Sequence, residues 1–225
     1  MTVVRSRARK QPADVRREEI LDAAVAVFAE TPFRAAGTAE IARRAGVAEP
    51  TLYRHYSSKR ELYLAALEEC GRAVLDSFRR IATEVPNAAH ALLTMGHWYA
   101  DNLDSDPVNL RLRQRAAAEA EDDEVRALLR GHYQHIVDVI AGVIERGQEQ
   151  GGIRRDVTPQ GGAWMFVAVG LTLDHARMLG YNRTDCSGWL DEMEETVKNA
   201  LVVNASAARA QMDQYALPFC TCASR

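Results

Sequence analysis

Apolar side chains recur along most of the chain with the three- and four-residue spacing of an α-helix. In residues 14–31 the apolar stripe consists of Ile20, Ala24, Val27 and Phe28. The same spacing, interrupted by turn residues, predicts helices over residues 38–45, 49–56, 58–82, 88–103, 122–150, 158–179 and 187–209, and a short helix that starts at Asp106-Pro107. Because no segment alternates with the two-residue period of a strand, the sequence predicts an all-α protein.

The two short helices predicted at 38–45 and 49–56 have the features of a helix-turn-helix. Thr38 is the predicted N-cap of the first, and Gly46 is predicted to adopt a positive φ in the turn between them. At 100° per residue, Leu52 and Tyr56 of the second helix face inward. The side chains that then point outward are Pro50, Thr51, Tyr53 and Arg54. Such a helix is suited to enter the major groove of DNA.

Charge is distributed unevenly along the chain. Residues 1–60 hold 12 Lys and Arg against 7 Asp and Glu, whereas the remaining residues hold 16 against 24. A basic amino-terminal part on an acidic body indicates a polyanionic partner for that part alone, although chance surface variation would give the same pattern. Residues 1–13, with Arg5, Arg7, Arg9 and Lys10, are predicted to be a basic disordered arm.

The stretch from Pro50 to Tyr63, which reads PTLYRHYSSKRELY, follows the predicted helix-turn-helix directly. Together with residues 38–49 it resembles the DNA-binding signature of the TetR family of bacterial transcriptional regulators. The resemblance implies an amino-terminal three-helix DNA-binding domain over residues 14–58 and a larger helical ligand-binding and dimerisation domain over residues 59–209. Residues 210–225 are then expected to be a flexible tail.

The resemblance also implies a function. We expect a homodimer that binds a palindromic operator on double-stranded DNA, represses transcription, and is released by a small apolar or amphipathic effector whose identity the sequence does not give. A ligand-responsive activator is the alternative, because the position of the operator relative to the promoter decides the sign. A sequence-independent DNA-binding protein is a further alternative, although it would not need a large apolar body.

The family pattern implies particular DNA contacts. Thr38 and Tyr53 occupy positions that bind backbone phosphate, and His55 and Lys59 occupy positions that add phosphate contacts. The residues expected to meet base edges or flanking phosphates are Glu49, Pro50, Thr51 and Arg54. Ala48 departs from the pattern, because many members have a serine there that caps the recognition helix. The missing cap is expected to cost on the order of 1 kcal/mol.

The carboxyl-terminal body contains the expected dimer surface and effector pocket. Residues 163–171 are apolar on all sides, as in a helix that is buried on both faces. The residues expected at the dimer interface are Trp164, Val169, Leu171, Trp189, Met193 and Val197. The candidate ligand-binding residues are Met95, Trp98, Tyr99, Leu103, Leu129, His132, Tyr133, Ile136, Phe166 and Val167. A plain hydrophobic core is the alternative for each of them.

Other chemistry finds little support in the sequence. There is no glycine-rich phosphate loop, nucleophile elbow or paired-carboxylate pattern, so an enzyme is not expected. His132, His135 and Asp138 share a helix but lack an evident fourth ligand, so no metal or cofactor is expected. The cysteines at 70, 186, 220 and 222 are predicted to be free thiols in the cytoplasm. Residues 163–173, the longest apolar run, are too few to span a bilayer.

Overall fold

The structure is a computed structural model that describes residues 12–181, 188, 192, 195–196 and 198–202. Most of the predicted basic arm, the predicted tail and three expected dimer residues, Trp189, Met193 and Val197, lie outside the described residues. The described residues are mostly helical, and the only β-type pairing among them is an isolated bridge between Ile153 and Val202. The all-α prediction is therefore confirmed.

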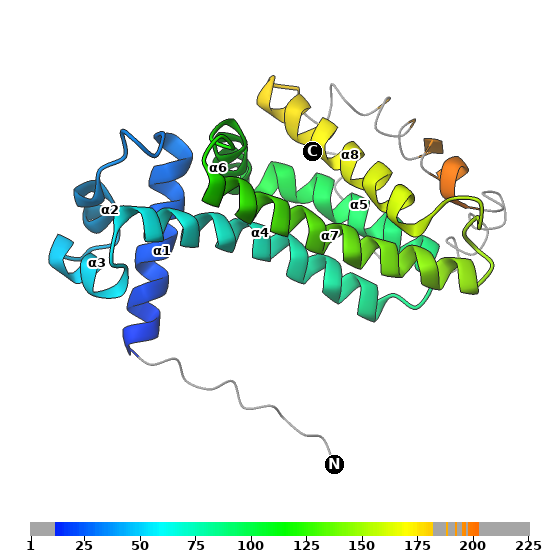
Figure 1. Ribbon diagram of the computed structural model, residues 1–225, viewed down its shortest axis with the longest axis horizontal. Helices are drawn as coiled ribbons and strands as arrows, with labels where there is room; N and C mark the ends of the chain where they lie inside the picture. The colour runs from blue at the N-terminus through cyan, green and yellow to red at the C-terminus, as the bar shows by residue number, and fades with distance from the viewer. Residues whose placement is uncertain (1–11, 182–187, 189–191, 193–194, 197, 203–225) are drawn as a thin grey trace, which may run out of the picture. The chain divides into compact units, whose positions relative to one another are not determined.

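Up to residue 179, the bounds of the observed helices differ from the predicted bounds by no more than two residues. They are α1 (Pro12–Glu30), α2 (Thr38–Arg44), α3 (Glu49–His55), α4 (Lys59–Glu84), α5 (Ala88–Ser105), α6 (Pro107–Ala118), α7 (Asp123–Glu149) and α8 (Pro159–Met178) (Figure 1). The helix predicted at 187–209 falls mostly on residues that are not described. No described helix combines the length and the apolar character that crossing a membrane requires.

The first compact unit comprises the described residues up to Gly71 together with Pro107–Leu129. In this unit α1 packs against α2 and α6, and α2 packs against α3. Nearly every core side chain here is fully buried, including Ile20, Phe28, Ile41, Leu52 and Leu62. This core fixes α2 and α3 relative to each other, because each contributes its apolar side to the same cluster.

The sequence did not indicate that α6 packs with the amino-terminal helices. Arg115 of α6 donates hydrogen bonds to the backbone oxygens of Ala29 and Glu30 at 2.9 and 3.0 Å. These are the last residues of α1, where carbonyl groups lack partners within the helix. The basic side chain of α6 therefore stabilises the end of α1. The domain boundary placed after residue 58 stays a prediction.

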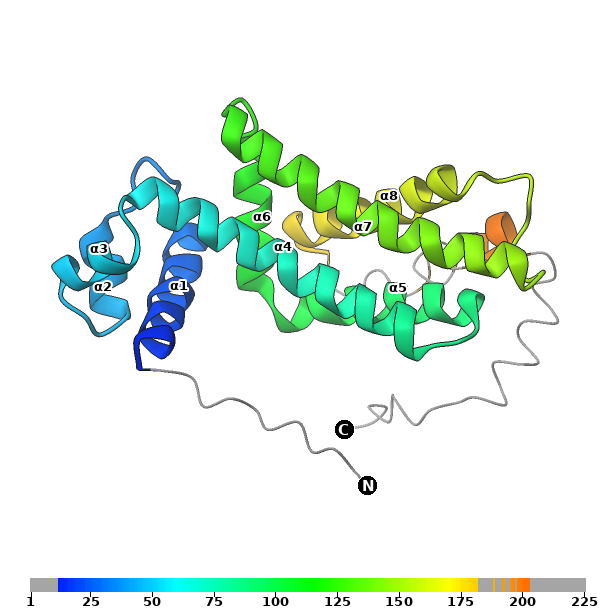
Figure 2. The same cartoon turned by 60° about the horizontal axis from the view of Figure 1, so that its bottom comes forward.

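The second unit comprises Arg72–Asp106 and the described residues from Arg130 onward. Its core is shared by the second part of α4 and by α5, α7 and α8 (Figure 2). Its fully buried side chains include Met95, Val137, Ile140, Ile144 and Ala163. Within this unit Arg146 of α7 donates to the backbone oxygens of Ala82 and Val85 at 2.6 and 3.0 Å. α7 is thereby fixed to the end of α4.

Two helix ends decide the geometry of the helix-turn-helix. Gly46 adopts φ of 65°, as predicted, a conformation that a residue with a Cβ rarely takes. The prediction that Thr38 is the N-cap of α2 is wrong. Gly37 is the N-cap, with extended backbone, and Thr38 is the first helical residue. Its hydroxyl is consequently directed to α3 and not to the amides of its own helix.

Candidate nucleic-acid interface and ligand cavity

α3 has one buried side and one exposed side. Leu52 is 0% exposed and Tyr56 is 1% exposed, whereas Tyr53 is 44% exposed. Pro50 and Arg54 are also exposed and Thr51 is half-buried, so the predicted inward and outward sides are confirmed. α3 starts after Ala48, whose extended backbone supplies the cap position without a side-chain hydrogen bond. The turn and the two buried residues thus fix which side chains α3 offers to a partner.

Three of the predicted DNA contacts lie together where the first residues of α2 and α3 meet. The Thr38 hydroxyl donates to Glu49 Oε1 at 2.5 Å, and it lies 3.2 Å from the Tyr53 hydroxyl. Arg54 Nη2 donates to Thr51 Oγ1 at 3.3 Å on the exposed side of α3. The structure therefore brings one hydroxyl from each helix together with the Glu49 carboxylate.

His55 and Lys59 are positioned by other parts of the unit. The backbone oxygen of His55 accepts from Arg17 Nη1 at 2.9 Å, and the His55 side chain is half-buried. Lys59 Nζ donates to the backbone oxygen of Ala36 at 2.8 Å and lies 4.7 Å from the centre of the Phe33 ring. Lys59 therefore stabilises the segment that precedes α2, a role that the sequence did not indicate.

Acidic residues hold the arginines of α2. Glu40 accepts hydrogen bonds from Arg43 and Arg44, which lower its pKa to about 2. Arg44 also pairs with Glu30 of α1 at 2.6 Å. These pairs are well exposed to solvent, so they contribute little stability and mainly fix where the guanidinium groups lie.

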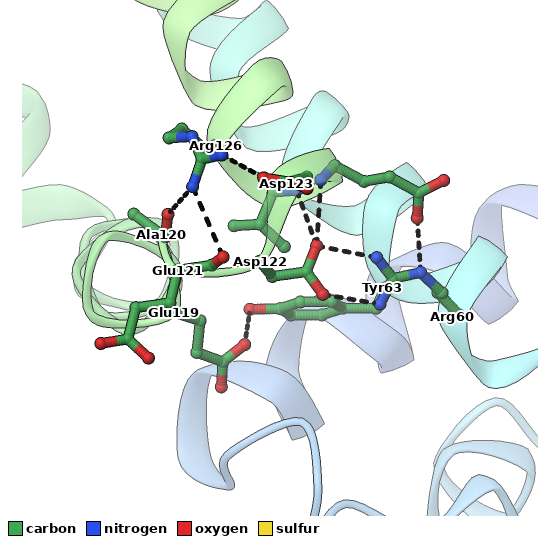
Figure 3. Close-up of polar contacts among 10 residues, drawn as sticks. Arg60, Tyr63, Glu119, Ala120, Glu121, Asp122, Asp123 and Arg126 are labelled. Carbon is green, nitrogen blue, oxygen red and sulfur yellow. Dashed lines mark hydrogen bonds and ion pairs between the residues drawn. The ribbon is translucent and has the colours of Figure 1, made fainter.

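A second polar cluster connects the start of α4 with the loop between α6 and α7 (Figure 3). Arg60 donates two hydrogen bonds to Asp122, at 2.9 and 2.7 Å, and a third to Glu124. Asp122 also accepts from the backbone amides of Glu124 and Val125 at the start of α7. The hydrogen bonds from Arg60 are the largest cause that lowers the pKa of Asp122 to about 2. All of these residues belong to the first unit.

The buried Tyr63 completes this cluster. Its hydroxyl donates to Glu119 Oε2 at 2.7 Å, and its ring stacks on Phe33 and meets Phe28 edge-on. Burial, followed by the hydrogen bond to Glu119, raises the pKa of Tyr63 well above its usual value. Tyr63, which belongs to the quoted sequence motif, therefore has an internal packing role.

The second unit contains an apolar cavity of about 50 Å³. It is lined by Val74, Phe78, Tyr99, Tyr133, Ile136, Ile140, Phe166, Val167, Gly170 and Leu171. Five of these, Tyr99, Tyr133, Ile136, Phe166 and Val167, were candidate ligand-binding residues. Phe78 meets the rings of Trp98, Tyr99 and Phe166 at 6.0 to 6.4 Å between ring centres. The lining is therefore mostly aromatic and branched aliphatic.

The other ligand-binding candidates lie elsewhere. Met95 and Leu103 are buried at 0% and 3% exposure, and Trp98 packs against Phe78 without lining the cavity. Leu129 packs against the core of the first unit, and His132 is half-buried outside the lining. Val74 and Phe78 are among the lining residues that the sequence missed, because they follow the same apolar stripe of α4 as ordinary core residues. In the described part of the chain, no group of three or more side chains is arranged to hold a metal ion.

α8 has a large exposed apolar side. Trp164, Leu171 and Met178 are 47%, 42% and 52% exposed, and their spacing of seven residues places them on one face. Leu179 and Tyr181, directly after the helix, are also exposed. Within the residues that the structure describes, one side of α8 is thus left exposed. Val169, another expected dimer residue, is half-buried.

These features define a class of protein: an all-helical chain with an amino-terminal helix-turn-helix and a helical body that contains an apolar cavity. Residues 20–66 match the family model described as bacterial regulatory proteins, tetR family. The solved complex of SmeT with triclosan has the same fold, with a TM-score of 0.72 at 22% identity over 84% of this chain and 93% of that chain. Residues 20–66 are thus similar in sequence to the bacterial tetR-family regulators, and the chain shares the fold of SmeT.

Two curated relatives are similar in sequence. The HTH-type transcriptional activator FasR of Mycolicibacterium smegmatis is 37% identical over 106 residues, which are 47% of this chain and 48% of FasR. The nucleoid occlusion factor SlmA of Marinobacter nauticus is 28% identical over 148 residues, 66% of this chain and 76% of SlmA. The similarity to FasR thus spans less than half of that protein.

Proposed function

We propose that this protein is a transcriptional regulator that binds double-stranded operator DNA through α2 and α3. The observation that carries the proposal is the geometry of α3, which is fixed by the buried Leu52 and Tyr56 and exposes Tyr53 and Arg54. A seven-residue helix presented in this way fits the major groove. The match of residues 20–66 to the family model supports the same role for this segment.

The outward groups divide into two roles. The hydroxyls of Thr38 and Tyr53 donate to backbone phosphates and fix the register of the protein on the duplex. Pro50, Thr51 and Arg54 meet base edges, where a threonine or proline contacts a thymine methyl and arginine recognises guanine. His55 and Lys59 add positive charge or donors beside the phosphates.

The regulator acts as a homodimer in this proposal. The exposed side of α8 supports it, because large apolar groups at Trp164, Leu171 and Met178 gain from burial against a second copy. A two-fold interface is self-complementary, so the same side of α8 in each copy forms both halves. The operator is then a palindrome, with half-sites separated by a whole number of helical turns.

The effector is an apolar or amphipathic small molecule that binds in the cavity of the second unit. The cavity volume of about 50 Å³ is well below the roughly 300 Å³ of the smallest sites for drug-sized ligands, so binding requires the aromatic lining to move. Phe78 and Val74 belong to α4, the helix that begins at Lys59 after α3. A ligand that favours a different position of α4 changes the affinity for DNA by its differential affinity for the two states. The solved complex of SmeT with triclosan supports a ligand of this kind.

Repression is the proposed mode, with activation as the second candidate. SmeT is named the repressor of a multidrug efflux pump in Stenotrophomonas maltophilia. FasR, in contrast, is named an activator and is 37% identical over the matched stretch. Transcription in vitro from a promoter that carries the selected site decides between the two modes by the sign of the change.

Selection of binding sites from random duplex DNA, followed by sequencing, tests the proposed function. We expect a palindrome of about 15 or more base pairs, as two half-sites require. Tyr53→Phe should weaken binding to the selected and to unrelated duplexes alike, by about tenfold for one lost hydrogen bond to a charged group. Thr51→Ala should change the base preferred at one position of each half-site.

The matched control is Tyr181→Phe, because Tyr181 is also an exposed tyrosine, 52% against 44% for Tyr53, but lies outside α2 and α3. It should leave both affinities unchanged. Recovery of no motif, or unchanged base preferences in Thr51→Ala, would contradict the proposed function of α3.

A further inference from the structure

The hydroxyl of Thr38 already has an anionic partner in the free protein. It donates to Glu49 Oε1 at 2.5 Å and lies 3.2 Å from the Tyr53 hydroxyl. A threonine hydroxyl has one proton, and that proton is directed to the carboxylate. The Tyr53 hydroxyl therefore donates to the Thr38 oxygen. The three groups form a chain of hydrogen bonds from Tyr53 through Thr38 to Glu49.

Thr38 and Tyr53 are the two hydroxyls that the proposed function assigns to DNA phosphate, and the inference rests on that function. We propose that the Glu49 carboxylate occupies the place of a DNA phosphate in the free protein and makes binding depend on its displacement. Carboxylate and phosphate are both anionic acceptors, and one hydroxyl proton serves one of them at a time. An arriving phosphate therefore has to replace Glu49 on Thr38.

The surroundings of Glu49 make this displacement costly on unsuitable DNA. In the part of the chain that the structure describes, Glu49 forms no ion pair, whereas Glu40 on α2 is paired with two arginines. Among the described residues, no paired cation thus neutralises Glu49 when a phosphate arrives at Thr38. A displaced Glu49 that stays near the DNA backbone is repelled by it, because like charges about 4 Å apart reduce affinity about fivefold even in water.

A suitable sequence relieves this penalty. Glu49 is the first residue of α3 and is only half-buried. Its carboxylate oxygens accept hydrogen bonds from the exocyclic amine of cytosine in the major groove. DNA that presents such an amine gives the displaced carboxylate a new partner, and other DNA does not. Glu49 is therefore a specificity-determining residue that acts mainly by disfavouring wrong sequences.

The test compares the wild type with Glu49→Gln and Glu49→Ala on two duplexes of equal length, the selected site and an unrelated sequence. Glutamine removes the charge but keeps an oxygen that accepts from Thr38, whereas alanine removes both. The control is Glu68→Gln. Glu68 is an exposed acidic residue on α4 in the same unit, so this substitution removes the same charge at a site away from Thr38. Dissociation constants are measured at several salt concentrations for all four proteins.

We expect Glu49→Gln to bind the unrelated duplex about fivefold more tightly. Its affinity for the selected site should rise less or fall, so the ratio of the two affinities drops. Glu49→Ala should behave in the same direction, and Glu68→Gln should leave the ratio unchanged. Equal effects of Glu49→Gln and Glu68→Gln on the unrelated duplex, or an unchanged ratio in Glu49→Gln, would overturn the inference.

The outcome separates the two proposals. If the wild type selects a palindrome and the affinity ratio is unchanged in Glu49→Gln, the proposed function stands and the inference about Glu49 is wrong. If the wild type shows no sequence preference, the proposed function is wrong. The affinities of the wild type and Glu49→Gln for the unrelated duplex still decide whether Glu49 opposes phosphate binding. A wild type that binds neither duplex overturns both.

Discussion

Gly147 offers a sharp test of how the second unit is packed. Gly147 lies two residues before the end of α7, where the chain turns back and Ile153 packs against the helix. A Cβ at position 147 would overlap Cδ1 and Cγ1 of Ile153 and would lie 3.0 Å from the Cβ of Ala88. Ile153 is 1% exposed and Ala88 is 0% exposed, so neither has room to move away.

Two opposing effects give the expected magnitude for Gly147→Ala. Alanine in a helix stabilises it by about 1 kcal/mol relative to glycine, chiefly by lowering the entropy of the unfolded chain. Overpacking a tightly filled site costs about 1 to 3 kcal/mol. Because the overlap involves a side chain with no exposed surface, we expect the cost to dominate and the free energy of unfolding to fall by about 1 kcal/mol. In a chain of this size that lowers the melting temperature by about 2 to 4 °C.

Gly142→Ala is the matched control, because Gly142 lies on the same helix and a Cβ there meets nothing within 4 Å. It should raise the free energy of unfolding by about 1 kcal/mol. Both variants are measured by urea unfolding followed by circular dichroism. Ile153→Val should cost less in the Gly147→Ala background than alone, since the shorter side chain relieves part of the overlap. If Gly147→Ala stabilised the protein as much as Gly142→Ala, the close approach of Ile153 to α7 would be refuted.

Three further changes test separate sites. Ala48→Ser should stabilise α3 by about 1 kcal/mol, measured by thermal unfolding, because it supplies the missing N-cap side chain. Asp122→Asn should lose less stability than the wild type as the pH falls from about 4 to about 2, measured by unfolding at each pH. The reason is that the folded pKa of Asp122 is lowered to about 2, so the stability it provides is present above its unfolded pKa and is lost on acidification. Gly170→Ala should weaken binding of an apolar effector, identified by screening for release of the operator, without changing operator affinity, since its Cβ would lie 3.3 Å from the Tyr99 ring in the cavity wall.

The features that the sequence predicted well depend on neighbours in the chain. The helix bounds follow from the spacing of apolar side chains and from turn residues, and both are local. The φ of Gly46 and the inward direction of Leu52 follow from the same local pattern. They required no knowledge of how distant segments pack.

The features that it did not predict depend on distant segments. Arg115 contacts the end of α1, more than 80 residues earlier in the chain, so nothing near α6 indicates that this helix packs with the first unit. Phe78 lines the cavity because α5, α7 and α8 surround that turn of α4, and the apolar pattern of α4 alone is the same for core and cavity. Thr38 was misassigned as an N-cap because its sequence signature is local, whereas its partner, Glu49, lies on the next helix.

Lys59 shows how a residue of a DNA-binding motif serves the fold and the proposed interface at once. Its ammonium donates to the Ala36 oxygen and lies over the Phe33 ring, next to the segment that leads into α2. An ammonium has three donors, so the bond to Ala36 leaves capacity for a phosphate oxygen. A free lysine loses side-chain entropy when it binds, at a cost of about 0.5 to 1.5 kcal/mol. Because Lys59 is already held in the free protein, the proposed phosphate contact would cost less side-chain entropy at this position.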